Sequence, residues 1–369
     1  MRHMIRLFIL FILCTPVVFS LSAEAQPSAP AASQLPQAAP PRATPPAAPV
    51  PPSPPLPRIR VQGNRFLNAK GDTLLFRGLS VADPDKIDRE GHWDKAFFRQ
   101  VRDMGTMLVR LPVHPSAWRA RTPEGYLPLL DSAVAWCGEL GMYVIIDWHS
   151  IGNLDLELFQ DPMYNTSKTE TYAFWRTIVH HFNGNSTVAF YELFNEPTSY
   201  GGQLGPVSWS HWKQINEELI RLIRSYDTKT DTKTDNQTIE LVAAFDWAYD
   251  LTPLREEPIQ ADNIGYVVHP YPFKRPQPWE PRWDEDFGFA AARYPVIATE
   301  IGFEIKPGDP ADGAEHYGTR ITQYLESRGI SWVAWVYDPE WWPALLKSWD
   351  NFPLTGTGEF FKKALNKKR

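Results

Sequence analysis

The strongest constraint on the fold is a regular alternation of short apolar runs with longer segments in which apolar residues recur at helical spacing. The short runs are nearly continuous in hydrophobic residues, which is typical of strands buried on both faces of a parallel sheet. Eight strands that alternate with helices predict one closed (β/α)8 barrel. The expected strands are residues 73–80, 107–113, 142–148, 188–195, 238–245, 263–269, 296–300 and 330–337. The expected helices are residues 93–104, 127–140, 168–182, 209–226, 286–293, 314–328 and 358–367.

The first 25 residues have the features of an export signal. Basic residues precede an apolar stretch at 7–21, and Ala23-Glu24-Ala25 matches a small-residue cleavage site. The alternative is a membrane anchor, but the stretch is short for a span and lacks a stop-transfer flank. We therefore predict a signal peptide at 1–25 and no stable membrane insertion after its removal. The expected location of the protein is secreted or periplasmic.

Residues 26–57 consist almost wholly of Pro, Ala, Ser and Gln. Such a segment cannot bury enough apolar surface to fold, so we predict a disordered linker. Hydrophobic periodicity begins at Arg58, and a small hairpin is expected over residues 59–67 around Gly63-Asn64. We predict a single catalytic domain at 58–369, of the size usual for one such barrel.

Charge and cysteine content exclude several classes of protein. The formal net charge is −6, and the globular part has no Lys/Arg cluster, so a nucleic-acid partner is not expected. Of the two cysteines, Cys14 lies in the predicted signal, and Cys137 alone cannot form an internal disulfide. No zinc-ligand spacing, phosphate loop, dinucleotide fingerprint or Gly-x-Ser-x-Gly elbow is present, so no metal or cofactor is predicted.

Two glutamates close apolar runs that we expect to be barrel strands. Glu196 lies in Asn195-Glu196-Pro197, where proline stops the strand, and Glu300 ends the run that begins at Val296. The carboxyl ends of barrel strands form one mouth, which is where such barrels hold their chemistry. Two carboxylates that converge there suit general acid, base or nucleophile roles.

Other polar and aromatic side chains fall at the same expected ends of strands. The second strand carries an arginine, and a histidine follows the third strand. The sixth strand leads into His-Pro-Tyr, and the eighth carries a tryptophan. These candidates are Arg110, His149, Asn195, His269, Tyr271 and Trp335, with His114 added from its position alone. Each histidine could instead be a satisfied core residue. Beside two carboxylates, the functional interpretation is favoured.

These motifs resemble those of glycoside hydrolase family 5, the cellulase family of clan A, over roughly residues 58–365. The resemblance identifies Glu196 in Asn-Glu-Pro as the acid/base and Glu300 as the nucleophile. It implies that Arg110, His149, Asn195, His269, Tyr271 and Trp335 bind substrate or support the catalytic pair. It also implies a retaining mechanism, in which a glycosyl-enzyme intermediate forms and is then hydrolysed.

The proposed chemistry requires the two carboxyl groups to differ in protonation. We expect Arg110 and the Tyr271 hydroxyl to keep Glu300 ionised. We expect Glu196 to hold a proton, because a second negative charge beside Glu300 is disfavoured. After the first step Glu300 is esterified, so Glu196 can then act as the base for water.

The tryptophans indicate the kind of substrate that we expect. The chain has 15, and an indole can cover the apolar face of a β-linked glucose while its N–H donates to a hydroxyl. Trp118, Trp148, Trp209, Trp247, Trp279, Trp341 and Trp342 fall in expected loops after strands. We predict a monomeric hydrolase of β-1,4-glucan, with a polysaccharide or oligosaccharide as its partner. The alternatives are a mannanase, another β-glycanase or transglycosylase, or a non-catalytic carbohydrate-binding barrel.

Overall fold

The computed structural model describes residues 55–198, 204–226, 238–305 and 314–368. The predicted signal peptide, most of the predicted linker and the polar segment at 227–235 lie outside these residues. The described residues all belong to the second of two units, which begins at residue 51.

The described strands include a closed parallel barrel of eight, as predicted. The barrel order is β11-β12-β13-β14-β4-β5-β6-β9, and β14 pairs with β4. The barrel strands are β4 (Arg77–Val81), β5 (Leu108–Val113), β6 (Tyr143–Trp148), β9 (Val188–Glu192), β11 (Ile239–Ala243), β12 (Ile264–Val267), β13 (Val296–Ile301) and β14 (Ser331–Tyr337). Nearly every residue of these strands is buried, which explains why their sequences are apolar without strict alternation.

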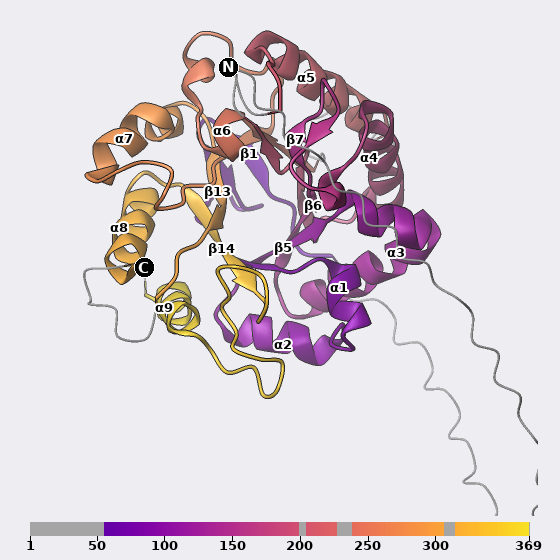
Figure 1. Ribbon diagram of the computed structural model, residues 1–369, viewed down its shortest axis with the longest axis vertical. Coiled ribbons are helices and arrows are strands. Elements are labelled where there is room, and N and C mark those ends of the chain that lie inside the picture. The colour runs from indigo at the N-terminus through magenta and orange to yellow at the C-terminus, as the bar shows by residue number, and fades with distance from the viewer. Residues whose placement is uncertain (1–54, 199–203, 227–237, 306–313, 369) are drawn as a thin grey trace, which may run out of the picture. The chain divides into compact units, whose positions relative to one another are not determined.

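Helices lie around the strands (Figure 1). They are α1 (Pro84–Arg89), α2 (Lys95–Asp103), α3 (Pro115–Glu139), α4 (Lys168–Phe182), α5 (Trp209–Tyr226), α6 (Phe245–Ala248), α7 (Trp279–Asp286), α8 (Ala314–Ser327) and α9 (Gly356–Leu365). The helix expected at 286–293 is wrong. Helix α7 ends where that helix was expected to begin, and a 3-10 helix, η4 (Gly288–Ala292), follows it.

A small sheet closes the amino-terminal end of the barrel. It consists of β1 (Arg60–Gln62), β2 (Arg65–Leu67) and β3 (Thr73–Leu74), and its first two strands form the predicted hairpin. Phe66 packs edge-on against Phe190, with ring centroids 5.1 Å apart, and Phe190 in turn packs edge-on against Phe76. These rings fill the barrel interior from below, so the opposite end is left for the site.

A second small sheet lies beside the mouth. It joins β7 (Ile151–Asn153), β8 (Leu158–Phe159) and β10 (Glu196–Pro197). Barrel strand β9 ends at Glu192, three residues before the end expected from the sequence. Asn195 and Glu196 instead donate backbone N–H groups to the carbonyls of Trp148 and Ser150. The motif is thus held beyond the barrel strand, over the mouth.

Among the described residues, none of the helices combines the length and apolar character required to cross a bilayer.

Candidate active site

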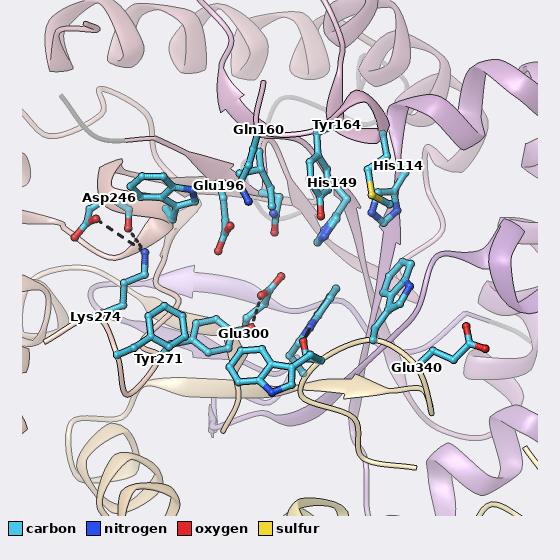
Figure 2. A pocket seen from close by; sticks show the side chains of 18 residues that line it. His114, His149, Gln160, Tyr164, Glu196, Asp246, Tyr271, Lys274, Glu300 and Glu340 are labelled. Carbon is cyan, nitrogen blue, oxygen red and sulfur yellow. Dashed lines mark hydrogen bonds and ion pairs between the residues drawn. The ribbon is translucent and has the colours of Figure 1, made fainter. Parts of the chain in front are cut away.

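A cavity of about 840 Å³ opens at the carboxyl ends of the barrel strands. Figure 2 shows Glu196, Gln160, Tyr164 and His149 along one wall and Tyr271 and Glu300 along the other. Every predicted site residue except Arg110 and His269 lines this cavity, and those two lie directly beneath its floor. The complete lining is His114, His149, Ile151, Gln160, Met163, Tyr164, Asn195, Glu196, Asp246, Trp247, Tyr271, Phe273, Lys274, Glu300, Trp335, Glu340, Trp341 and Trp342.

Arg110 is the electrostatic centre of the floor. This fully buried guanidinium on β5 binds both oxygens of Glu192, at 2.8 and 2.9 Å. It also donates to Glu300 Oε1 at 2.7 Å and Asn195 Oδ1 at 2.6 Å, and pairs with Asp147 at 2.9 Å. Burial alone would lower the pKa of Arg110, but the three carboxylates raise it well above its ordinary value. The arginine is therefore a permanent cation that orients four side chains.

Glu300 lies on β13 between two donors. Its Oε1 accepts from Arg110, and its Oε2 accepts from the Tyr271 hydroxyl at 2.7 Å, as the sequence predicted. Burial nevertheless raises the pKa of Glu300, and the charges of His269 and Arg110 oppose this effect without cancelling it. Arg110 and Tyr271 thus favour the ionised carboxylate, whereas desolvation favours the protonated one.

Glu196 faces His269 and approaches Glu300. Its Oε1 lies 2.9 Å from His269 Nδ1, while His269 Nε2 lies 2.9 Å from the hydroxyl of Thr299. One oxygen of Glu196, one oxygen of Glu300 and one nitrogen of His269 all lie within 4.8 Å of one another. These three side chains could in principle hold a metal ion, although each is already paired with a neighbour. The two carboxylates are close enough to act on one bond.

Asn195 presents an unused donor to the cavity. Its Oδ1 is held by Arg110, whereas its buried Nδ2 has no partner among the described residues. A buried amide N–H without an acceptor costs free energy, so this position favours an oxygen from a bound molecule.

Two histidines and a tryptophan form the opposite end of the floor. His149 stacks parallel to Trp335, with ring centroids 5.3 Å apart, and its Nδ1 lies 2.6 Å from Asp147. Burial lowers the pKa of His149 well below its ordinary value, and the charges of nearby groups act in the same direction. His114 also lines the cavity, as its position in the sequence suggested. Its Nδ1 lies 3.0 Å from Asp83 Oδ2.

The rim combines tryptophans expected from the sequence with Gln160, Asp246 and Lys274, which the sequence did not indicate. Trp247 donates to Gln160 at 2.8 Å, and Lys274 donates to the Asp246 carbonyl at 2.7 Å. Trp247, Trp341 and Trp342 line the cavity, but the other four loop candidates are buried in the core. Asp246 and Trp247 have left-handed backbone conformations, a feature without a sequence signal at non-glycine residues.

The chain is similar to known proteins in sequence and in structure. The family model described as Cellulase (glycosyl hydrolase family 5) matches residues 67–340. Endoglucanase E-5 of Thermobifida fusca is 24% identical over 291 residues, which are 77% of this chain and 56% of that protein. Endoglucanase A of Butyrivibrio fibrisolvens is 27% identical over 225 residues, 58% of this chain and 45% of that protein. The chain thus spans about half the length of these curated relatives.

A solved structure shows greater similarity. The β-glucanase SdGluc5_26A of Saccharophagus degradans, in complex with cellotetraose, is 43% identical with a TM-score of 0.78. The alignment covers 84% of this chain and 93% of that one. Together with the match to most of the barrel, these findings show that the chain belongs to the cellulase family, glycosyl hydrolase family 5.

Proposed function

We propose that the protein is a retaining glycoside hydrolase that cleaves β-1,4-linked glucan of the cellulase type. The observation that carries this proposal is the close approach of Glu196 and Glu300, which have oxygens within 4.8 Å of each other. Inverting enzymes separate their carboxyl groups by about 6.5–9.5 Å to admit a water molecule. The cellotetraose bound to the S. degradans relative supports a glucan substrate.

Glu300 would act as the nucleophile. Arg110 and Tyr271 fix both of its oxygens, so one of them faces the cavity in a defined position. Attack by Glu300 on the anomeric carbon breaks the bond to the leaving oxygen and forms the glycosyl-enzyme. The unpartnered Nδ2 of Asn195 would donate to a hydroxyl of the same sugar.

Glu196 would act first as the acid and then as the base. Its proton passes to the leaving oxygen, and the resulting carboxylate later takes a proton from the water that releases the sugar. We further propose that the protein is exported, because its sequence begins with the features of a signal peptide.

Removing the two carboxyl groups separately tests these roles. Glu196→Ala should release dinitrophenol from a dinitrophenyl cellobioside in a burst, since this leaving group needs no proton. Azide should then accelerate turnover and give a β-glycosyl azide. Glu300→Gln should show no burst and no azide rescue, whereas Glu285→Gln, an exposed control, should behave as wild type.

Product stereochemistry and substrate choice complete the test. Nuclear magnetic resonance of the first product from the wild-type enzyme should show the β-anomer, and an initial α-anomer would contradict double displacement. Carboxymethyl-cellulose or mixed-linkage glucan should be cut faster than mannan. Faster cleavage of mannan would replace the glucanase assignment with a mannanase.

A further inference from the structure

A chain of hydrogen bonds connects the acid/base carboxyl to a third buried carboxylate that takes no part in the reaction proposed above. Glu196 Oε1 contacts His269 Nδ1 at 2.9 Å, and His269 Nε2 contacts Thr299 Oγ1 at 2.9 Å. Thr299 Oγ1 in turn donates to Glu192 Oε1 at 3.0 Å. Glu192, His269 and Thr299 are each 0% exposed, so bulk water cannot take the place of any link.

The direction of each hydrogen bond follows from the chemistry of the groups. Both oxygens of Glu192 accept from Arg110, and the resulting pairing lowers the pKa of Glu192 although burial opposes it. An ionised carboxylate only accepts, so Thr299 must give its single hydroxyl proton to Glu192. The Thr299 oxygen is then left to accept, and His269 Nε2 must carry the hydrogen.

This direction leaves only Nδ1 of His269 free to change its protonation. Neutral His269 offers a lone pair at Nδ1 to a protonated Glu196. Cationic His269 offers an N–H at Nδ1 to an ionised Glu196. The same single proton lies between the two atoms in both cases, so His269 and Glu196 share it.

We propose that Thr299 and Glu192 are positioning residues that act on Glu196 through His269, by holding the imidazole hydrogen at Nε2 and committing Nδ1 to the acid/base carboxyl. The inference rests on the proposed role of Glu196. The experiments below distinguish a failure of this positioning role from a failure of the acid/base role of Glu196.

The charges around His269 favour retention of the shared proton. Burial lowers the pKa of His269, but the negative charges raise it to about 9, with Glu300 the strongest of them. The titratable and charged groups that face or influence the imidazole are Glu192, Glu196 and Glu300, with Arg110, Asp147 and His149 behind them. Thr299 contacts the imidazole of His269 and carries no charge, so it can be replaced without altering these charges.

Replacement of Thr299 by valine is the direct experiment. Valine keeps the shape and removes the acceptor, which leaves the Nε2 hydrogen unsatisfied and weakens proton binding by the pair. The basic limb of kcat/KM for phenyl cellobioside should move toward lower pH by about one to two units, the loss of a hydrogen bond to a charged group. Thr299→Ser should retain the wild-type profile, and Thr177→Val, a half-buried control on α4, should not change it.

A substrate that needs no acid separates positioning from damage. With dinitrophenyl cellobioside, kcat/KM reports only formation of the glycosyl-enzyme, so its basic limb should be the same in Thr299→Val and wild type. Equal shifts for both substrates would mean a general distortion of the site and would overturn the inference. So would identical profiles of the valine and serine variants with phenyl cellobioside.

A spectroscopic measurement on the wild-type enzyme needs no variant to fold. Nitrogen-15 spectra of histidine-labelled protein should show the His269 Nε2 protonated throughout the titration and Nδ1 as the titrating nitrogen. A neutral His269 protonated at Nδ1 would refute the proposed direction. If Glu196→Ala failed to show the burst described above, the acid/base role itself would be wrong, whatever the nitrogen spectra showed.

Discussion

Replacement of Arg110 by methionine tests whether one guanidinium holds the floor of the site together. Methionine has a similar length and no charge, so the change removes contacts to Glu192, Glu300, Asn195 and Asp147 without leaving a large cavity. Breaking a buried ion pair by removing one partner costs about 3–5 kcal/mol, because the remaining charge stays buried without compensation.

The corresponding change in melting temperature is measurable. At about 2 °C for each kcal/mol in a domain of this size, we expect the transition to fall by about 6–10 °C at neutral pH. Arg282→Met is the matched control. Arg282 is 57% exposed and pairs with Glu285 one helical turn away, so its loss should cost no more than about 1 kcal/mol.

The pH dependence of the loss identifies its cause. Without Arg110, burial raises the folded-state pKa of Glu192 and Glu300 above the unfolded value of about 4.3. Such groups bind protons more tightly when the protein is folded, so stability falls as pH rises above the unfolded pKa. The difference between Arg110→Met and wild type should therefore be larger at pH 7 than at pH 5. A loss equal to that of Arg282→Met, or one that grows toward low pH, would refute the reasoning.

Two further predictions concern the scaffold. Gly78→Ala should destabilise the barrel by about 1–3 kcal/mol, because a Cβ there would lie 2.4 Å from the Leu108 carbonyl oxygen. Gly125→Ala, where a Cβ would make only an ordinary van der Waals contact with Arg121 on a helical backbone, should be neutral or stabilising in chemical denaturation. Deleting residues 26–54 should leave the turnover of soluble oligosaccharides and the melting temperature unchanged, whereas deletion through Pro57 should lower the melting temperature, because Pro57 accepts a hydrogen bond from Tyr143. Equal effects of the two deletions would show that the contact between Pro57 and Tyr143 does not contribute to stability.

Strand identity was predictable from the sequence because the barrel buries both faces of its strands. The apolar runs at 142–148 and 296–300 match β6 and β13 to within one residue at each end. The end of β9 was not predictable in the same way. Leu193 and Phe194 are fully buried although they follow the strand, so hydrophobicity continues past the residue at which the strand ends.

The site was predictable where a residue is tied to the end of a strand. Glu300 and His149 follow apolar runs, and the resemblance to a known family assigned roles to them. Trp247 lies on α6 and Lys274 on a loop. Their contacts with Gln160 and Asp246 depend on backbone conformations and long-range packing that no local pattern specifies. Thr299 was overlooked because a hydroxyl inside an apolar strand has no signal of its own.

The network around Arg110 also affects how the site stabilises the charge that develops in the transition state. The guanidinium, three carboxylates and the Asn195 amide are aligned by hydrogen bonds within the protein itself. Dipoles that are fixed during folding do not have to reorient as charge develops in the transition state, so the reorganisation energy of each turnover is small. The same alignment holds like charges together inside the barrel, where apolar residues would pack more stably. We expect variants selected only for heat resistance to accumulate substitutions in this layer and to lose activity as they do so.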